Sequence, residues 1–260
     1  MNFIQKVFNG LEWKDLVPPL FYKLRSKFEN VTGRRVGTAR RLHYARMPDE
    51  VSPAWVVDVG AADGAMARAA LDSYPSCKVV CFEPCASTFT EMKNALSRYG
   101  ERVRLIHAAV ADYTGETQLH ITTSRFANSL FPQSEKYKEE NPAIHEISSE
   151  TVHVVSLDSL DLDLPPRSDG ILKIDVEGSE MEVLLGGRKF ISGKVDWIII
   201  ELAFARRTGD FFLRILNLLD EYGFEIANII DMSQSGWNQC YVCSLDAVFR
   251  RKKRVPAEDK

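Results

Sequence analysis

Acidic residues and glycines gather at three points of this 260-residue chain, each directly after a run of apolar residues. The first point is the segment 58–64, which reads Asp-Val-Gly-Ala-Ala-Asp-Gly; the second is Glu83, and the third is the pair Asp175 and Glu177. Glycine lets a backbone turn sharply and approach a ligand with no Cβ between them. A carboxylate beside such a turn can accept ribose hydroxyls or take a proton from a reacting hydroxyl. The pattern is typical of a site for a nucleoside-containing cofactor.

The glycine spacing separates two kinds of cofactor. A dinucleotide-binding turn needs glycines in the pattern G-x-G-x-x-G. Here Ala62 stands at the third position of the turn and Gly64 follows two residues later, a spacing that does not suit a pyrophosphate. Glu83 suits the ribose of a nicotinamide or of an adenosyl cofactor equally. A nicotinamide-dependent oxidoreductase is therefore the weaker alternative from another enzyme class.

Alternating strands and helices must position these residues. From Trp55 onward, short runs rich in β-branched residues alternate with helical segments, which predicts a doubly wound, mainly parallel α/β sheet. Ligands of such sheets bind outside the carboxyl ends of the strands. The polar stretch Asn128–Thr151 has no clear period and predicts an excursion or lid over the sheet edge. The expected strands are Trp55–Val59, Lys78–Phe82, Val103–His107, Gly170–Asp175 and Val195–Glu201 with a closing antiparallel pair, Phe224–Ile230 and Tyr241–Phe249; the expected helices lie at 66–71, 87–98, 179–185 and 209–222.

Four motifs accompany these elements: Val57–Gly64, Phe82–Pro84, Ser156–Leu160, and Leu172–Glu180 with Leu184–Gly186. The run Lys-Ile-Asp-Val-Glu-Gly within the last is the most specific. Together the motifs resemble the FkbM family of S-adenosylmethionine-dependent methyltransferases over roughly residues 56–201. The resemblance implies a class I methyltransferase Rossmann-like fold, with a mainly parallel seven-stranded sheet, an antiparallel C-terminal strand and S-adenosylmethionine as cofactor.

The resemblance also implies where the cofactor lies. The glycine turn would shape the pocket for its methionine end, Glu83 would hold the ribose hydroxyls, and the backbone after the third strand would face adenine. Asp63 stands where the family commonly has Asn. The implied cofactor-binding residues are Asp58, Gly60, Ala61, Ala62, Asp63, Gly64, Glu83, Pro84, Ala109, Val110, Asp112 and Asp175.

Candidate catalytic residues follow the later strands. Methyl transfer by in-line displacement needs an aligned acceptor and, for a hydroxyl acceptor, removal of its proton. Asp175 or Glu177 is the candidate base or acceptor-orienting carboxylate, and Lys173 could pair with either. Glu201 ends a nearly continuous apolar strand and is the next candidate. Structural roles remain open, since Glu177 could cap a helix, Asp175 could bind water near the cofactor amine, and Glu201 could form a salt bridge.

The candidate acceptor-binding residues are Asn128, Ser129, Glu177 and Glu201. Asn128-Ser129 matches a place where the family often has Asn-Ser, although a loop cap explains the pair equally well. No metal site is expected. The five histidines show no close pairing, and Cys240 and Cys243 would face opposite sides of a strand.

The chain divides into three regions by charge and pattern. Residues 1–50 hold ten basic against five acidic side chains and two amphipathic segments, which predicts a basic helical N-terminal extension or cap. An acceptor-recognition lid or a phosphate-facing surface is the alternative for this region. Residues 51–250 are the expected Rossmann-like methyltransferase domain, and 251–260 are an expected basic disordered tail.

The function expected from the sequence is O-methylation of a hydroxyl on a small molecule, sugar or glycan. A non-catalytic module that binds the adenosyl cofactor is a further alternative. The net charge of −3 with an acidic remainder argues against a nucleic-acid partner, and no apolar run reaches the length of a membrane span. The absence of a secretory pattern and the odd number of five cysteines indicate the cytoplasm. The oligomeric state stays open, a homo-oligomer included.

Overall fold

The computed structural model describes residues 47–48, 51–166, 168–204, 206–207, 210–234 and 242–253. All of them belong to one unit that spans residues 43–260. The helices expected within residues 1–46 lie outside the described residues, as does the expected tail from 254 onward. Among the described helices, none has the length and apolar character needed to cross a membrane.

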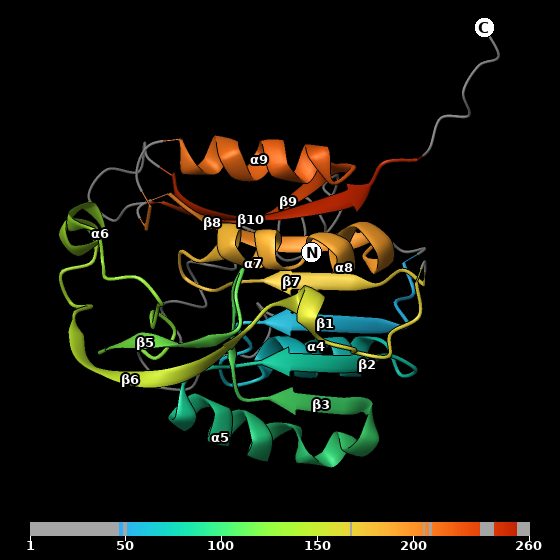
Figure 1. Ribbon diagram of the computed structural model, residues 1–260, viewed down its shortest axis with the longest axis horizontal. Coiled ribbons are helices and arrows are strands. Elements are labelled where there is room, and N and C mark those ends of the chain that lie inside the picture. The colour runs from blue at the N-terminus through green and yellow to red at the C-terminus, as the bar shows by residue number, and fades with distance from the viewer. Residues whose placement is uncertain are drawn as a thin grey trace, which may run out of the picture. The chain divides into compact units, whose positions relative to one another are not determined.

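A seven-stranded sheet runs through the middle of the described unit (Figure 1). Its strands are β1 (Trp55–Val59), β2 (Lys78–Phe82), β3 (Val103–Ile106), β7 (Ile171–Ile174), β8 (Trp197–Ala203), β9 (Phe224–Gln234) and β10 (Val242–Arg251). Their order is β3-β2-β1-β7-β8-β10-β9. The first five strands in this order pair in parallel, and β10 runs antiparallel to both β8 and β9. The predicted mainly parallel seven-stranded sheet with an antiparallel C-terminal strand is therefore confirmed.

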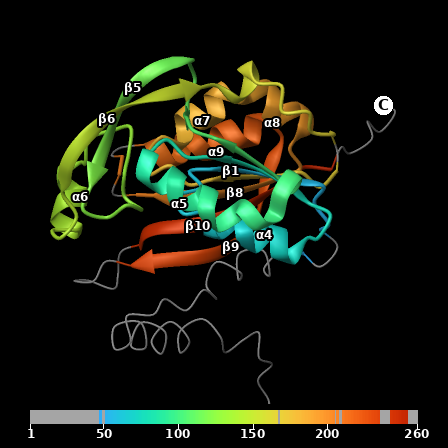
Figure 2. The same ribbon diagram turned by 90° about the horizontal axis from the view of Figure 1, so that it is seen from below.

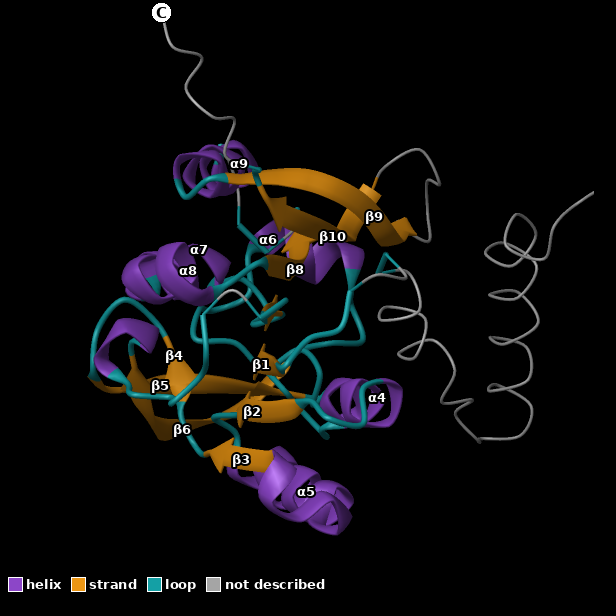
Figure 3. Ribbon diagram, turned by 90° about the vertical axis from the view of Figure 1, so that its right-hand side faces the viewer, coloured by secondary structure: helices purple, strands orange, loops and turns teal. Residues whose placement is uncertain are grey.

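Helices cover both faces of this sheet, as Figures 2 and 3 show. They are α4 (Ala65–Ser73), α5 (Ala86–Leu96), α7 (Glu180–Gly186), α8 (Arg188–Lys194) and α9 (Phe211–Glu221). Successive side chains of a strand point to opposite faces, so β1 feeds two cores. Val57 and Val59 are buried with residues of α7, α8 and α9, whereas Val56 is buried with residues of α4 and α5. Burial on both faces explains why β1 is apolar almost throughout.

A second, three-stranded sheet has the order β4-β6-β5. It consists of β4 (Ala109–Val110), β5 (Gly115–Thr122) and β6 (Glu146–Val155), and a short helix α6 (Glu135–Glu140) lies between β5 and β6. The stretch Asn128–Thr151, predicted as an excursion or lid over the sheet edge, contains α6 and the first residues of β6, two elements that were not predicted from the sequence. Most side chains in the first half of β6 are exposed, so the apolar alternation that marks a half-buried strand is missing there.

Residues 123–145, here called the connecting segment, join β5 to β6 and contain α6. In Figure 1 the arrowheads of β1, β2 and β7 point toward the side where α6 and the β5–β6 ribbon lie. The connecting segment therefore lies at the carboxyl ends of the parallel strands, where the ligands of doubly wound sheets bind.

Two polar side chains hold the start of α8 and the end of β10 in place. Asp158 accepts hydrogen bonds from the backbone N–H groups of Lys189 (2.9 Å) and Phe190 (2.8 Å), so it caps the first turn of α8 from a distant segment. Arg251, which the sequence assigns to the tail, is the last residue of β10 and donates from Nε to the carbonyl of Val195 at 2.8 Å. The final strand thus ends two residues later than expected, at Arg251 instead of Phe249.

Candidate active site

The turn after β1 brings two parts of the chain into close backbone contact. Gly60 has φ 76°, and Ala62, a residue with a side chain, has φ 47°. The N–H groups of Gly60 and Ala61 donate to the carbonyl of Phe82 at 3.0 and 2.9 Å, which ties the turn to the end of β2. A Cβ added at Gly60 would lie 1.9 Å from the carbonyl oxygen of Asp175. Only glycine fits here, because both the φ angle and the contact exclude a side chain.

Replacing Gly60 with alanine is expected to destabilise the protein more than the same change at Gly100. Gly100 also has a positive φ, 57°, but nothing lies within 4 Å of its added Cβ. Gly100→Ala should therefore cost only the left-handed backbone penalty, about 1 to 2 kcal/mol, whereas Gly60→Ala adds a clash with backbone. Urea unfolding of both variants measures the difference. Equal losses of unfolding free energy in the two variants would show that the backbone at Asp175 moves to accommodate the new Cβ at little cost.

Glu83 follows β2 and holds the glycine turn from the other side. Its Oε2 accepts from the N–H of Ala62 at 2.8 Å, and its Oε1 accepts from the N–H of Cys85 (2.9 Å) and the hydroxyl of Thr88 (2.7 Å). Only 6% of the residue is exposed. Burial raises the pKa of Glu83 above its usual value, and these three donors oppose the rise. Oε2 has a single partner among these contacts, so the carboxylate retains acceptor capacity for a ligand.

Asp63, where the resemblance expects asparagine, is engaged by the protein. Its Oδ1 accepts from the N–H of Ala65 at 3.2 Å, close to the left-handed Gly64 that precedes α4. Its Oδ2 lies 3.4 Å from the guanidinium of Arg125 in the connecting segment, which also pairs with Glu91 of α5. The extra carboxylate therefore has a positive partner and ties the glycine turn to the connecting segment.

Lys173 joins the turn after β1 to the end of β7. It stands opposite Asp58 in the parallel register of β1 and β7, and its Nζ lies 3.1 Å from Asp58 and 3.2 Å from Asp175. The same ammonium donates to the carbonyl of Gly60 at 3.0 Å. Burial alone would lower the pKa of Lys173, but Asp175 and Asp58 outweigh burial and raise it above its ordinary value. Lys173 is thus a buried cation that lies between the carboxylates of Asp58 and Asp175.

Three carboxylates converge near the carboxyl ends of β7 and β8. Glu201 does not end its strand as expected, because β8 continues to Ala203. Asp175, Glu177 and Glu201 each offer an oxygen within 4.8 Å of the others, and here they are called the carboxylate cluster. Burial raises the pKa of Glu177 to about 8; Arg206 opposes this shift, and Asp175 adds to it. Burial, the charges of Asp175 and Glu177 and a hydrogen bond with Asp175 raise the pKa of Glu201 well above its usual value. The cluster therefore holds exchangeable protons close to neutral pH.

Glu177 has a backbone that its neighbours hold in an uncommon conformation. Its φ is 59°, a left-handed value that residues with a side chain adopt rarely. The hydroxyl of Ser129, a buried residue, donates to the carbonyl of Glu177 at 2.8 Å. Asn128 lies beside it but uses its Oδ1 to accept from the N–H of Thr122 at 2.9 Å. Of the predicted pair, Ser129 is thus joined to the carboxylate cluster through its backbone, and Asn128 closes a turn.

Sequence reasoning missed Arg206, which follows β8. This buried side chain pairs with the carboxylate of Glu177, and its Nη2 also donates to the hydroxyl of Tyr137 in α6 at 2.9 Å. Arg206 stands next to Arg207 in a chain rich in charged residues. Its role depends on contacts that are distant in sequence, so no local pattern marks it.

The other predicted cofactor positions lie beside the second sheet. Ala109 and Val110 form β4 and are buried, and Asp112 is exposed in the turn that follows. The carbonyl of Pro84 lies 3.0 Å from Nε2 of His107 at the end of β3. These residues stand apart from the contacts that join the glycine turn to the carboxylate cluster.

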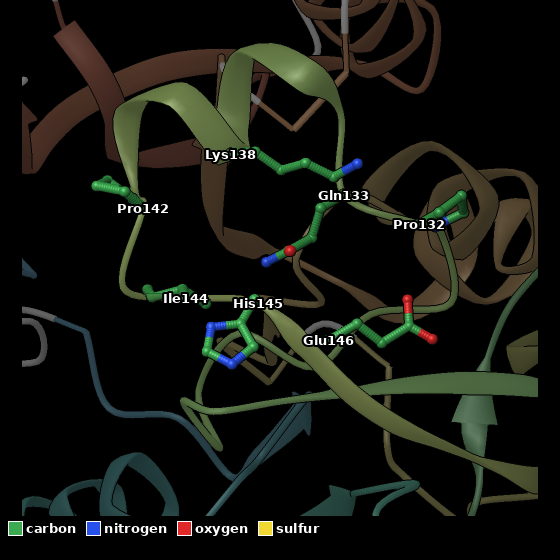
Figure 4. A pocket seen from close by; sticks show the side chains of 7 residues that line it. All are labelled: Pro132, Gln133, Lys138, Pro142, Ile144, His145 and Glu146. Carbon is green, nitrogen blue, oxygen red and sulfur yellow. The ribbon is translucent and has the colours of Figure 1, made fainter.

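A pocket of about 300 Å³ lies in the connecting segment (Figure 4). It has apolar, amide, basic and acidic groups in its wall. Lys138 contributes to it from α6, directly after Tyr137, so the pocket and the Arg206 contact share one short helix. The lining residues are Pro132, Gln133, Lys138, Pro142, Ile144, His145 and Glu146.

The absence of a metal site stays a prediction. Two of the histidines pair with carboxylates in the second sheet, His120 with Glu146 at 3.0 Å and His153 with Glu116 at 3.3 Å. Cys240 lies outside the described residues. The carboxylate cluster, however, has the kind of oxygen donors that a hard divalent cation uses.

Comparison with known proteins identifies a family. The model of the methyltransferase FkbM domain matches residues 58–226, which include the glycine turn, Glu83 and the carboxylate cluster. No sequence among the curated proteins matches the chain.

Three solved structures are similar to this chain at low sequence identity. A TehB-like SAM-dependent methyltransferase from Corynebacterium glutamicum is 13% identical with a TM-score of 0.47, covering 90% of this chain and 97% of its own. Magnesium protoporphyrin IX methyltransferase from Synechocystis PCC 6803, with bound SAM, is 13% identical with a TM-score of 0.47 and covers 89% and 96%. A ribosomal protein L11 methylase from Lactobacillus delbrueckii is 14% identical with a TM-score of 0.44 and covers 85% and 81%.

Proposed function

We propose that this protein, which belongs to the FkbM methyltransferase family, transfers a methyl group from S-adenosylmethionine to a hydroxyl of its acceptor. The family assignment favours an adenosyl cofactor over a nicotinamide cofactor. The finer part of the proposal, oxygen as the methyl acceptor, rests on one observation. The carboxylate cluster contains a residue, Glu177, whose pKa of about 8 suits proton removal near neutral pH.

The residues present fit the adenosyl cofactor. At Gly60 the glycine turn packs against the backbone of Asp175, which places the turn beside the carboxylate cluster. Glu83 stands at the end of the neighbouring strand and would hold the ribose hydroxyls, as carboxylates at this place in doubly wound folds do. When bound, S-adenosylmethionine supplies an activated methyl group. The chain's own residues then have to align the acceptor and remove its proton.

Glu177 is the proposed general base. Its carboxylate takes the proton of the acceptor hydroxyl, and the guanidinium of Arg206 stabilises the ionised form before the proton arrives. Asp175 is held by Lys173 and has the more exposed side chain, with 39% against 21% for Glu177, so we assign it the role of orienting the acceptor. Burial, together with the charges of Asp175 and Glu177, raises the pKa of Glu201 well above its usual value, and Glu201 shares a hydrogen bond with Asp175.

The acceptor is proposed to be a small molecule, a sugar or a glycan, modified in the cytoplasm. Paired carboxylates suit hydroxylated acceptors, because each oxygen can accept a hydrogen bond from a hydroxyl.

Calorimetric titration with S-adenosylmethionine, S-adenosylhomocysteine and NAD tests the cofactor. We expect both adenosyl ligands to bind and NAD to give no heat. Methyl-labelled S-adenosylmethionine is then offered with panels of hydroxylated and of amine compounds, and the products are identified by mass spectrometry. Tight binding of NAD alone, or methylation restricted to amines, would overturn the proposal. Cofactor binding without transfer to any acceptor class would support the non-catalytic module instead.

Glu83→Gln is expected to weaken binding of S-adenosylhomocysteine by about 10- to 100-fold, because two hydrogen bonds from ribose hydroxyls lose their charged acceptor. The dissociation constant is measured by calorimetry. Glu101, an exposed residue after α5, supplies the matched control Glu101→Gln, which should bind as the wild type does. Urea unfolding of both variants separates a weaker ribose contact from a disturbed glycine turn. An unchanged dissociation constant for Glu83→Gln would remove Glu83 from the cofactor site.

A further inference from the structure

Arg206 joins three parts of the molecule through one buried guanidinium. Its Nη2 pairs with the carboxylate of Glu177 and donates to the hydroxyl of Tyr137 at 2.9 Å. Its Nη1 donates to the carbonyl of Ala127 at 3.4 Å, and its Cζ lies 3.7 Å from the centroid of the Tyr137 ring. Only 6% of Arg206 is exposed. Two of these three partners, Ala127 and Tyr137, belong to the connecting segment.

The connecting segment also contacts Glu177 directly, through Ser129. Ser129 donates to the carbonyl of Glu177 at 2.8 Å and accepts from the N–H of Phe131 at 3.1 Å. The side chain of Glu177 is therefore held by Arg206, which also binds Ala127 and Tyr137 of the connecting segment, and its backbone is held by Ser129 of that segment. A residue with a left-handed φ keeps that conformation only where its surroundings fix it.

We infer that Arg206 is a positioning residue that places the connecting segment and orients the Glu177 carboxylate in a single arrangement. The inference rests on the proposed function, since it assigns Glu177 the role of base. Arginine suits this task because its planar fork can bind a carboxylate and other acceptors at once while its face stacks on an aromatic ring. The position of the connecting segment and the orientation of the base therefore depend on one residue.

Several titratable groups and one cation surround Glu177 and determine how its carboxyl titrates. The carboxylates of Asp175, Glu180 and Glu201 lie on the strand ends and on α7, the phenol of Tyr137 lies on α6, and Arg206 is the cation among them. Because Arg206 opposes the other groups, its removal should make the carboxyl of Glu177 harder to ionise. Loss of packing alone would not move the titration of one carboxyl in this direction.

The test compares Arg206→Gln, Arg206→Lys and Tyr137→Phe in the full-length protein. Carboxyl-labelled glutamate NMR follows the titration of Glu177, and amide hydrogen exchange follows α6. For Arg206→Gln we expect the midpoint of Glu177 to rise by more than one pH unit, α6 amides to exchange at least tenfold faster, and methyl transfer at pH 7.5 to fall at least tenfold with partial recovery at pH 9.5.

The other two variants separate charge from anchoring. Arg206→Lys should restore the midpoint of Glu177, because it keeps the cation, but not the protection of α6. Tyr137→Phe should speed exchange in α6 and leave the midpoint nearly unchanged. Arg250→Gln, on the exposed pair with Glu225, is the matched control and should change neither readout. If Arg206→Gln does not fold, Arg206→Lys and Tyr137→Phe still carry the comparison.

An unmoved midpoint of Glu177 in Arg206→Gln would overturn the inference, as would full rescue of every readout by lysine. Failure of the proposed function gives a different result. In that case the wild type transfers no methyl group to any hydroxyl, whereas the NMR and exchange differences between the variants persist.

Discussion

Glu177→Gln is expected to lower kcat for methyl transfer by about 10²- to 10⁴-fold, the usual contribution of a positioned general base. Glutamine keeps the shape of the side chain but cannot accept a proton from the acceptor hydroxyl at neutral pH. Glu177 lies after β7 with its carboxylate against Arg206, and no contact joins it to Glu83, which we assign to the cofactor ribose. The affinity for S-adenosylhomocysteine, measured by calorimetry, should therefore stay within about twofold of the wild-type value.

Asp175→Asn is the matched comparison within the same cluster. It keeps a polar group that can still contact the acceptor, so its main effect should fall on KM for the acceptor, with a smaller loss of kcat. If Asp175→Asn abolished turnover and Glu177→Gln left it intact, the two carboxylates would have exchanged roles. If both variants kept full turnover, the carboxylate cluster would not take part in proton removal.

Lys173→Met is expected to destabilise the fold by about 3 to 5 kcal/mol, the typical result of removing one partner of a buried ion pair. The side-chain volumes are similar, so a cavity contributes little. What remains is the fully buried carboxylate of Asp58, which loses its cation. Asp175 and the carbonyl of Gly60 lose the same ammonium as a partner. The free energy of unfolding in urea measures this loss.

Two further variants test the cause of that loss. Lys78 is exposed at the start of β2, so Lys78→Met should leave the unfolding free energy nearly unchanged. Adding Asp58→Asn to Lys173→Met removes the orphaned charge and should recover part of the lost stability. If the double variant were less stable than Lys173→Met by the full cost of Asp58→Asn alone, the two side chains would not interact.

Most strands of the main sheet can be predicted from the sequence. Apolar runs bounded by turn residues locate β1, β2, β7 and β8, because strands buried on both faces are apolar along their length. The motif at residues 172–180 also locates Asp175 and Glu177, since a side chain just after a parallel strand lies at the ligand edge of the sheet. The pairing of Lys173 with Asp175 was open from the sequence, and its pairing with Asp58 follows from the register of β1 and β7.

The sequence predicts much less of the region around the connecting segment and Arg206. The start of β6 is polar and exposed, and α6 is short and has no buried side chain, so neither leaves an apolar period. Arg206 acts on Glu177 and Tyr137, which are far from it in sequence and near it only in the fold. Ser129 was predicted at the site, but its hydroxyl is committed to the carbonyl of Glu177. Long-range contacts of this kind follow from tertiary packing.

The pH dependence of kcat for methyl transfer to a hydroxyl acceptor tests the central claim most directly. Glu177 has to be ionised to accept the proton, and burial raises its pKa to about 8. Turnover by the wild type should therefore rise with pH along an acid limb whose midpoint lies near 8, and Glu177→Gln should lose that limb together with its activity. A midpoint near the ordinary glutamate value, or a kcat that does not vary with pH, would contradict the assignment of Glu177 as the base.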